Sequence, residues 1–244
     1  MNRQGPGKIE WTDWSWSIVT GCSKLCPYCY AAAMARRFRR SFEPTCHPER
    51  LGEPGKLRQP SKIFVASAGD LFDPAIPFDF VAQVWQAMWQ APQHTYQILT
   101  KQPARMREFV TKWYSETSGM ATRQQDFYSH VWLGTTITNQ ADADERIPEL
   151  LQTPAAVHFV SVEPMLGAVD LTAIDYDEIL AAFAWQGRIA WVIVGAQTGP
   201  RAIPPQRDWV ESLREQCQRA GVPYFEKGSI AKVVDRPLVQ EWPK

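Results

Sequence analysis

Short runs of β-branched and aromatic residues alternate along the whole chain with longer segments that repeat apolar residues at helical spacing. The seven strand candidates are Trp16–Thr20, Lys62–Ala66, Thr95–Leu99, Val131–Thr136, Val157–Val162, Ile189–Val194 and Pro223–Phe225. The helix candidates between them are Ala31–Arg40, Phe78–Gln90, Ala104–Tyr114, Ala141–Leu151, Tyr176–Phe183 and Trp209–Arg219. Strands separated by helices are mostly parallel and joined by right-handed crossovers, so this alternation predicts an α/β fold with an open sheet or a partial or full β/α barrel.

Two stretches interrupt the alternation. Ser41–Pro60 contains four prolines and little apolar periodicity, and Ser115–His130 is polar and irregular. Both are predicted to be long surface loops rather than linkers between domains. No internal repeat is present, so residues 1–244 are expected to form a single domain.

Composition narrows the class of protein. The chain is 45% hydrophobic and 21% charged, which is typical of a folded globular protein and excludes intrinsic disorder. Its 26 Lys and Arg residues balance 26 Asp and Glu residues. With no net charge there is no global field to attract nucleic acid or an anionic membrane, so any nucleic-acid site must be local.

The chain also lacks the usual signals for export or membrane insertion. Residues 1–20 contain no apolar stretch followed by a small-residue cleavage site, and no later run is long and apolar enough to span a bilayer. The cysteine count of five is odd, which argues against a disulfide framework. We therefore expect a cytoplasmic protein with no membrane partner.

Three of the five cysteines lie within eight residues, between the first strand candidate and the first helix candidate. Cys22, Cys26 and Cys29 have the spacing C-x3-C-x2-C, which lets one loop wrap three thiolates around a single inorganic centre. A structural zinc site or an ordinary [4Fe–4S] site takes four protein ligands, so three cysteines leave one metal position free for a substrate or cofactor. The sequence therefore predicts an open catalytic metal site.

Two other interpretations of these cysteines stay open. The first is a zinc knuckle completed by Cys46 or His47, which lie in the proline-rich loop. The second is three unrelated buried thiols. Cys217, inside the last helix candidate, is expected to pack as a small hydrophobic residue.

The cysteine motif, with the aromatic residue Tyr28 directly before its last cysteine, resembles the cluster motif of the radical S-adenosylmethionine superfamily. The stretches Ile9–Asp13, Cys29–Ala31 and Val222–Phe225 resemble one branch of that superfamily, a family common in phages and bacteria whose function is unassigned and whose layout is similar to that of spore photoproduct lyase. This resemblance implies a partial (β/α) barrel of six or seven mostly parallel strands.

The resemblance also implies two cofactors. A [4Fe–4S] cluster is held by the three cysteines, and its free iron chelates the methionine part of S-adenosyl-L-methionine. Transfer of an electron into the sulfonium then gives methionine and a 5′-deoxyadenosyl radical, which abstracts hydrogen from a substrate. Tyr28 is expected to shield the cofactor, and an electron donor of the flavodoxin or ferredoxin type is an expected partner.

Ligands gather at the carboxyl ends of parallel strands, and the residues after the second and third strand candidates are polar there. By position, Ser67, Gly69 and Asp70 resemble the superfamily segment that holds the methionine amine, and Lys101 resembles the lysine that meets the cofactor. The alternative for Asp70 is a role in a turn or as a helix cap, and for Asp73 this alternative is the favoured one. The alternative for Lys101 is a solvated surface position.

The next two strand candidates add three residues. Alternation puts Thr136 and Thr138 on one face, where their hydroxyls are candidates for binding ribose, although threonine is also favoured in strands for packing alone. Glu163 ends the fifth strand before a proline, where burial without a partner would be costly. It is the first candidate for substrate binding or proton transfer.

The last two strand candidates complete the predicted site. Gly195 lies in a segment that resembles the late glycine motif beside the adenine, and Gln197 stands where relatives commonly have Glu, so recognition there is expected to differ. Gln197 and Lys227 are further catalytic candidates. A surface ion pair between Glu226 and Lys227 is the alternative.

The basic run Arg36–Arg40 ends the first helix candidate. Such runs usually complement the helix dipole and face solvent, but four guanidiniums near the cysteine loop are also able to bind phosphates. Together with the similarity to spore photoproduct lyase, this run favours a nucleobase, nucleotide or nucleic acid as substrate. The neutral charge favours a small molecule or peptide, and a metal-stabilised, noncatalytic binding module is the rival class.

Overall fold

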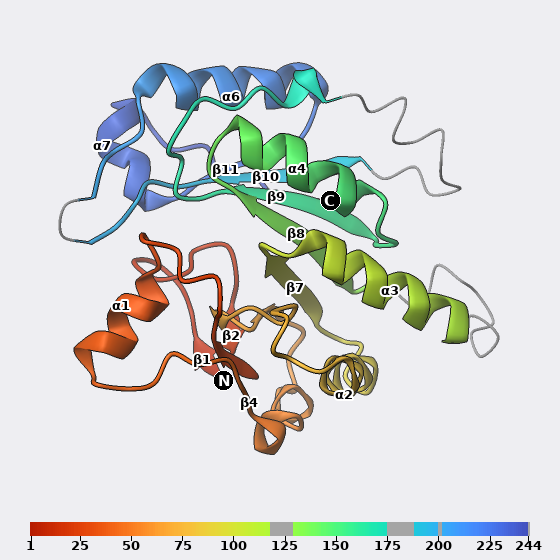
Figure 1. Cartoon of the computed structure of the whole chain (residues 1–244). Helices are drawn as coiled ribbons and strands as arrows, with labels where there is room; N and C mark the ends of the chain where they lie inside the picture. Colours follow the sequence, from red (N-terminus) through yellow and green to blue (C-terminus); the bar gives the residue numbers. More distant parts are fainter. Residues whose placement is uncertain (118–128, 175–187, 200–201, 244) are drawn as a thin grey trace.

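The computed structural model describes residues 1–117, 129–174, 188–199 and 202–243. Its main feature is an eight-stranded sheet in the order β1-β2-β5-β7-β8-β9-β10-β11 (Figure 1). These strands are β1 (Asn2–Arg3), β2 (Trp14–Trp16), β5 (Lys62–Val65), β7 (Thr95–Thr100), β8 (Val131–Ile137), β9 (Val157–Val162), β10 (Ile189–Val194) and β11 (Tyr224–Glu226). Neighbouring strands are parallel except for the antiparallel pair β1 and β2.

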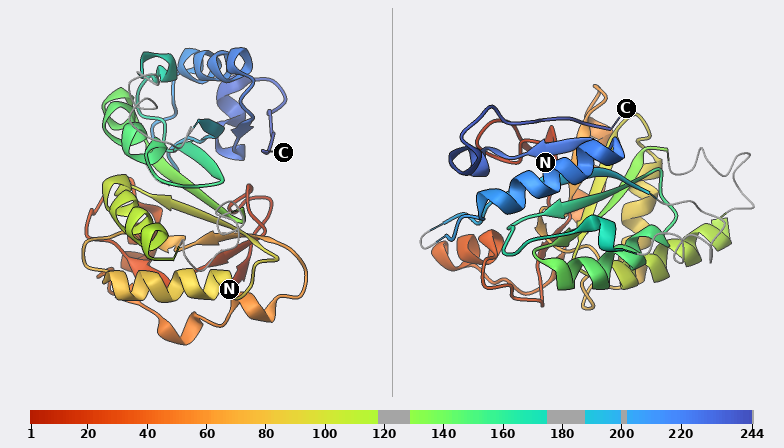
Figure 2. Two further views of the ribbon diagram at one scale, coloured as in Figure 1. Left: turned by 90° about the vertical axis from the view of Figure 1, so that its right-hand side faces the viewer. Right: turned by 90° about the horizontal axis from the view of Figure 1, so that it is seen from above.

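From β2 onward the strands lie in the sheet in their chain order. Each right-handed crossover therefore moves in the same direction and puts its helix on the same face of the sheet. We call this face the outer face, and Figure 2 shows four helices along it: α2 (Phe78–Trp89), α3 (Pro103–Thr117), α4 (Gln140–Leu151) and α6 (Arg207–Ala220). Two shorter helices are α1 (Tyr30–Arg37), which follows β3, and α7 (Ala231–Val234), which follows β11. The predicted helix Tyr176–Phe183 falls outside the described residues.

The main core lies between the outer face and the helices. Alternate residues of the strands, such as Ile63 and Ile98, pack with Val84 of α2, Ile147 of α4 and Leu213 of α6, and all five are fully buried. Burying a side chain of this size contributes about 1.5–3 kcal/mol. This packing holds the sheet and these three helices together.

The opposite face, which we call the inner face, carries a second cluster made largely of aromatic residues. Phe64, Phe159, Trp191 and Phe225 extend from four different strands, and Trp11 packs on them from the segment before β2. The ring of Trp11 lies 4.7 Å from that of Phe64 and 6.1 Å from that of Trp191. A loop residue therefore covers the middle of the inner face.

The prediction of a partial (β/α) barrel of six or seven strands is wrong. The sheet has eight strands and stays open, with β1 and β11 at its two edges. The physical reason lies in β11, whose outer edge is already taken. The amide of Glu226 donates to the carbonyl of Val239 at 2.7 Å, and the amide of Glu241 donates to the carbonyl of Tyr224 at 3.0 Å. The C-terminal segment thus ends the sheet instead of another strand closing it.

The first predicted strand and the first predicted loop also differ from the structure. Trp16–Thr20 is divided between β2 and β3 (Val19–Gly21), and β3 joins a second sheet in the order β4-β3-β6 with β4 (Thr45–Cys46) and β6 (Ala68–Gly69). The segment Ser41–Pro60 therefore supplies a strand, followed by two 3-10 turns, Pro48–Arg50 and Pro54–Lys56. The pairing of β4 with β3 was not predicted, because this segment is polar and lacks the apolar alternation typical of a strand.

Among the described residues, no helix combines the length and the apolar character needed to cross a bilayer.

Candidate functional site

The register of the central strands gathers polar residues of the inner face at their carboxyl ends. Thr136 on β8 is the register partner of Ser161 on β9. Glu163 follows two residues later on the same face, since side chains alternate along a strand. The amides of Gly195 and Lys227 continue the ladder, at 3.1 and 3.0 Å from carbonyls of the neighbouring strands. We call these five residues the rim.

An ion pair crosses the rim from one side of β10 to the other. Lys227 Nζ donates to Glu163 Oε1, and the two side chains are 15% and 25% exposed. Gly195 lies beneath them, and a Cβ atom there would come within 2.9 Å of Glu163 Cδ. The alternative pairing with Glu226 is wrong, because Glu226 lies on the other face, fully buried, and binds Arg236 at 2.8 and 2.9 Å.

Lys101 lies beside the rim because a buried carboxylate fixes the end of β7. Asp70 accepts hydrogen bonds from the Thr100 hydroxyl at 2.7 Å and from the amides of Lys101 and Phe72 at 3.0 Å. Burial raises the pKa of Asp70, although the hydrogen bonds from Lys101 and Thr100 oppose that shift. Three of its acceptor positions are therefore occupied within the protein. Its predicted contact with the cofactor stays a prediction.

A second carboxylate fastens the cysteine loop to the sheet. Asp73 is fully buried and accepts from the amide and hydroxyl of Ser23 at 2.7 and 2.8 Å, and from the amide of Ala75 at 3.0 Å. Burial works to raise the pKa of Asp73, but these hydrogen bonds outweigh it and the pKa lies below its ordinary value. The sequence indicated only a capping role, since Ser23 lies 50 residues away in the chain.

The three predicted metal ligands, Cys22, Cys26 and Cys29, are free thiols of intermediate exposure on the loop between β3 and α1. Cys22 Sγ accepts from the amide of Lys24, and Cys29 Sγ caps α1 by accepting from the amide of Ala32, both at 3.4 Å. Such N–H to sulfur contacts are among those that tune iron–sulfur centres. Burial, opposed by the Lys24 amide and reinforced by nearby carboxylates, raises the pKa of Cys22 to about 12.

Within the described residues, no three His, Cys, Asp or Glu side chains are gathered closely enough to hold a metal ion. The donor set fits an iron–sulfur centre by its chemistry, because thiolates are the ligands that such centres take. Binding requires the thiols to lose their protons and to turn toward a common centre.

The alternative fourth ligands for a zinc site are engaged elsewhere. His47 Nε2 lies 2.8 Å from Thr20 Oγ1 and its Nδ1 lies 3.1 Å from Glu49 Oε1, so both ring nitrogens have partners. Cys46 is in β4 and packs against the main core. The three-cysteine centre and the closed zinc knuckle both stay predictions.

Two tyrosines of the cysteine loop and of the first turn of α1 reach toward the rim. Lys101 Nζ lies 5.6 Å from the centre of the Tyr28 ring, within the range of a cation–π contact. The Tyr30 hydroxyl donates to the Ser67 carbonyl, and burial of this hydroxyl, with the nearby Glu163 charge, raises its pKa. The loop therefore lies over the strand ends. Tyr30 was not among the predicted site residues.

Three other predicted residues are committed to local structure. Thr138 donates to Asp142 through its amide at 2.9 Å and its hydroxyl at 2.7 Å, at the start of α4. Gly69 permits the close approach of β3, since a Cβ atom there would lie 2.7 Å from a carbonyl oxygen of that strand. Gln197 accepts from the amide of Ile203 at 3.4 Å and holds its own loop. These contacts do not test the predicted roles of the three residues in ligand binding, which stay predictions.

The inner face also holds polar atoms that sequence analysis missed. Ser161 Oγ, Gln97 Oε1 and Trp11 Nε1 are buried and have no hydrogen-bond partner among the described residues. Ser161 belongs to the rim and lies two residues before Glu163 on the same face. The alternation of side chains along β9 puts Ser161 on the same face as Glu163, and this was the signal in the sequence. It was not used, because a single serine in a mostly apolar strand is common.

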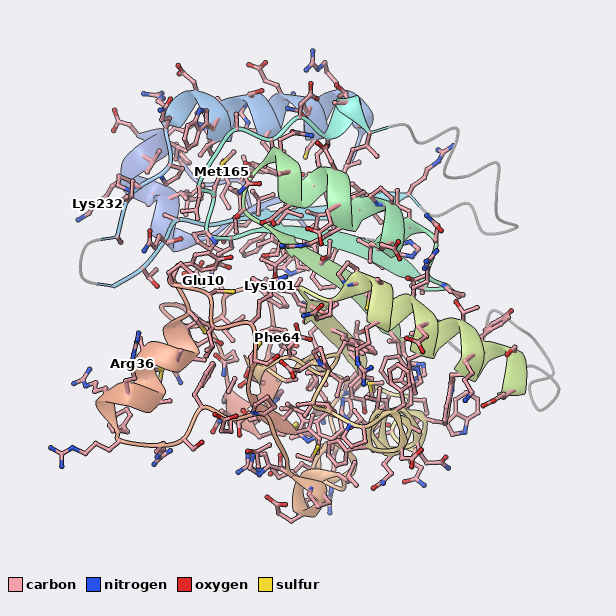
Figure 3. All side chains as sticks on the ribbon, viewed as in Figure 1. Glu10, Arg36, Phe64, Lys101, Met165 and Lys232 are labelled. Carbon is pink, nitrogen blue, oxygen red and sulfur yellow. The ribbon has the colours of Figure 1, made fainter. Side chains whose placement is uncertain are left out.

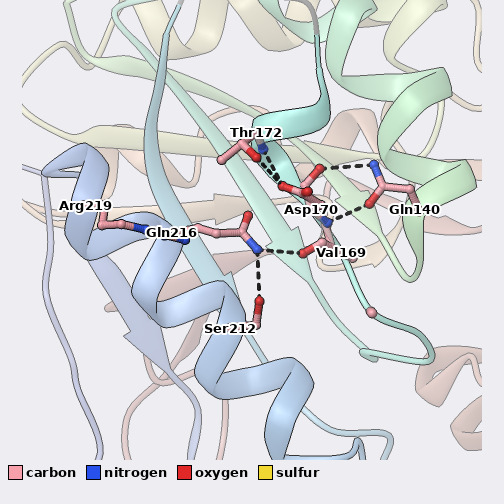
Figure 4. A pocket seen from close by; sticks show the side chains of 8 residues that line it. Gln140, Val169, Asp170, Thr172, Ser212, Gln216 and Arg219 are labelled. Carbon is pink, nitrogen blue, oxygen red and sulfur yellow. Dashed lines mark hydrogen bonds between the residues drawn. The ribbon is translucent and has the colours of Figure 1, made fainter.

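A separate hollow of about 370 Å³ lies between the start of α4 and α6 and contains none of the predicted site residues (Figure 4). Gln140 and the backbone of Asp170 exchange two hydrogen bonds across it, and Gln216 binds the Val169 carbonyl at 3.1 Å. Because these polar groups hydrogen-bond to one another, we interpret the hollow as a polar contact region between α4 and α6 and not as a ligand site.

Comparison with known proteins gives one match. A family described as "Protein of unknown function (DUF5131)" matches residues 6–233, which is nearly the whole chain and includes the cysteine loop and the rim. No curated protein and no solved structure matches the chain.

Proposed function

Starting from a chain that belongs to the DUF5131 family, we propose that this protein is an enzyme that binds a [4Fe–4S] cluster through Cys22, Cys26 and Cys29 and cleaves S-adenosyl-L-methionine reductively. The observation that carries the proposal is the position of the cysteine loop. It is fastened by Asp73 and extends Tyr28 over Lys101, beside a rim with one anionic and one cationic side chain. When bound, the cluster supplies the electron that cleaves the sulfonium to methionine and a 5′-deoxyadenosyl radical.

The protein's own groups bind and orient the two charged ends of an amino acid. Glu163 matches an ammonium group, and Lys227 or Lys101 matches a carboxylate. The Glu163–Lys227 pair keeps both charges satisfied until such a ligand exchanges partners with them. Gly195 leaves the space in which this exchange takes place, since any larger residue would collide with Glu163.

The rest of the site keeps water from a reactive species. Below the rim, Phe159, Ile193 and Phe225 form an apolar floor in which each is fully buried. Tyr28 covers the site from the loop side. A dry, shaped site of this kind is what radical chemistry needs, because it prevents side reactions with solvent.

The substrate is the finer part of the proposal. Ser161 Oγ and Gln97 Oε1, which have no partner in the part of the chain that the structure describes, support a planar substrate with hydrogen-bonding groups, of the nucleobase, nucleotide or nucleic-acid class. A small molecule or a peptide is the second candidate, supported by the neutral charge of the chain. Thiolate ligation of iron also fits a reducing, cytoplasmic compartment with a flavodoxin or ferredoxin type of electron donor.

The test is anaerobic reconstitution with iron and sulfide. We expect about four irons per chain, a brown protein, and release of 5′-deoxyadenosine when dithionite and S-adenosyl-L-methionine are added. Cys26→Ala is expected to abolish release, whereas Cys46→Ala, a matched thiol outside the loop, is expected to retain it. A folded Cys26→Ala variant that still released 5′-deoxyadenosine would refute the mechanism.

The rival class is a metal-stabilised binding module that performs no reaction. A colourless protein that purifies with one zinc ion and loses it in the Cys46→Ala variant supports that rival.

A further inference from the structure

Helix α1 differs from the other long helices in that none of its residues is buried. It lies at the edge of the molecule, on the side where the carboxyl ends of the strands open (Figure 1), and Arg36 extends from it in Figure 3. Its apolar residues are also exposed, Met34 by 54% and Phe38, at its C-terminal end, by 57%. Packing against the core therefore does not explain why this surface carries the residues it does.

The charge on this surface has one sign. Arg36, Arg37, Arg39 and Arg40 are all exposed, and none of them forms a salt bridge with any of the described residues. The sequence from residue 22 to residue 42 contains no Asp or Glu. In a chain of zero net charge, this is a local concentration of positive charge.

The backbone conformation at the C-terminal end of α1 places two of these guanidiniums beside the Phe38 ring. The amides of Arg39 and Arg40 donate to the carbonyls of Arg36 and Ala35, the pattern of a Schellman motif. Arg39 takes the left-handed conformation, with φ of 52°, at the position where glycine is usual. The guanidiniums of Arg37 and Arg40 then lie 5.8 and 5.7 Å from the centre of the exposed Phe38 ring.

We propose that this surface, made of Arg36, Arg37, Phe38, Arg39 and Arg40, binds single-stranded nucleic acid. Its guanidiniums pair with successive phosphates, and one base stacks on Phe38. A basic surface with an exposed aromatic ring is the combination that single-strand binding uses, because every nucleotide offers both a phosphate and a π face. The ring flanked by two guanidiniums favours this ligand over a carboxylate-rich protein, which would need the arginines alone.

The surface is placed to deliver a nucleotide to the rim. Helix α1 begins one residue after Cys29, and eight helical residues span about 12 Å. A strand bound along α1 therefore continues toward Glu163 and the buried hydroxyl of Ser161. This second step rests on the proposed function, whereas binding to α1 stands without it.

The experiment measures binding of a fluorescein-labelled single-stranded oligonucleotide of about twelve nucleotides to the full chain by anisotropy. We expect affinity to fall as salt rises. The double variant Arg36→Gln/Arg40→Gln is expected to reduce the slope of log K against log[salt] by about 1.4, at about 0.7 per phosphate. The matched control, Arg58→Gln/Arg207→Gln, removes two exposed arginines elsewhere and is expected to leave affinity and slope unchanged.

The stacking contact has its own variants. Phe38→Ala and Phe38→Leu are both expected to weaken binding about 10- to 100-fold, because leucine keeps apolar bulk without a π face. The proposal is overturned if no oligonucleotide binds, or if the control pair weakens binding as much as the α1 pair. It is also overturned, in favour of an acidic protein partner, if polyglutamate displaces the oligonucleotide as well as unlabelled oligonucleotide does and Phe38→Leu has no effect.

The outcome separates this inference from the proposed function. If the protein binds the oligonucleotide but releases no 5′-deoxyadenosine, the proposed binding surface is supported and the proposed reaction is refuted. If the protein releases 5′-deoxyadenosine but binds no oligonucleotide, the proposed reaction is supported and the proposed binding surface is refuted.

Discussion

Helices α1 and α6 have the same kind of C-terminal cap but opposite relations to the rest of the protein. Helix α6 ends at Gly221 with φ of 66°, and it buries Val210, Leu213 and Cys217 against the sheet. Helix α1 ends with a left-handed arginine and buries none of its residues. The difference shows that α6 is held by packing, whereas α1 is held at its first turn and leaves the rest of its surface exposed.

The two regions are also fastened differently. Near α6, the buried Glu226 binds Arg236 through two hydrogen bonds and also accepts from the amide of Val239 at 2.8 Å. The cysteine loop before α1 depends on Asp73 and on the bond from Tyr30 to Ser67. We therefore expect substitutions near α6 to change global stability and substitutions near α1 to change binding and local order.

The largest effect is expected from Arg236→Met. This change leaves the fully buried Glu226 without its cation and is expected to lower the free energy of unfolding by about 3–5 kcal/mol. Arg214→Met is the matched control, since among the described residues Arg214 pairs with Glu211 alone, in an ion pair whose side chains are 33% and 24% exposed, and its loss is expected to cost less than about 1 kcal/mol. Urea titration measures both, and equal losses would show that burial of the pair is unimportant.

Packing in the two helices is compared by truncating one apolar residue in each. Leu213→Ala in α6 opens a cavity in the main core and is expected to cost about 2–4 kcal/mol. Met34→Ala in α1 removes a side chain that is 54% exposed and is expected to change stability by no more than about 0.5 kcal/mol. A comparable loss for Met34→Ala in the same urea titration would contradict the view that α1 is not held by packing.

The anchor of the cysteine loop is tested with Asp73→Ala. Removing three accepted hydrogen bonds is expected to cost about 1–3 kcal/mol, and the effect should be local. Hydrogen exchange is expected to speed up at Ser23 while the amides of β9 keep their protection. Uniform loss of protection across both would instead assign Asp73 to the global core.

The smallest effect is a pH dependence near α6. Hydrogen bonds from Arg236, opposed by burial and reinforced by the charges of Arg236 and Arg214, lower the pKa of Glu211. Because its pKa is lower in the folded state, Glu211 contributes stability above its unfolded pKa of about 4.3, and this contribution is lost as pH falls through the folded value. Glu211→Gln is expected to reduce the loss of stability between neutral and acid pH by less than about 1 kcal/mol in urea titrations. An unchanged pH dependence would contradict this assignment.

Much of the secondary structure follows from local signals. The predicted bounds of β9 and β10 match the structure, because both are short runs rich in β-branched and aromatic residues and almost entirely buried. The helix predictions for α2 and α4 differ from the structure by one residue at an end. By contrast, β1 and β4 were not predicted and β3 was predicted only in part, because strands of two or three residues depend on pairing with a partner more than on their own composition.

The site shows the same division. The cysteine spacing is visible in the sequence, as are Glu163 and Lys227 at strand ends, but their pairing with each other is not. Sequence neighbours suggested Glu226 and Lys227 as the pair, whereas alternation puts these two on opposite faces of β11. Tyr30 and the anchoring role of Asp73 were missed because both depend on contacts between segments that are distant in the chain.

The amino-acid sequence alone determined the alternation of strands and helices, the trio of cysteines and the cluster of arginines, since each is a property of neighbouring residues. The tertiary structure decided that the sheet stays open, because the C-terminal segment occupies the edge of β11. It also decided which charges meet at the rim and which helix is left unburied. These outcomes depend on the register between strands and on competition for a single edge, and no stretch of the chain encodes either by itself.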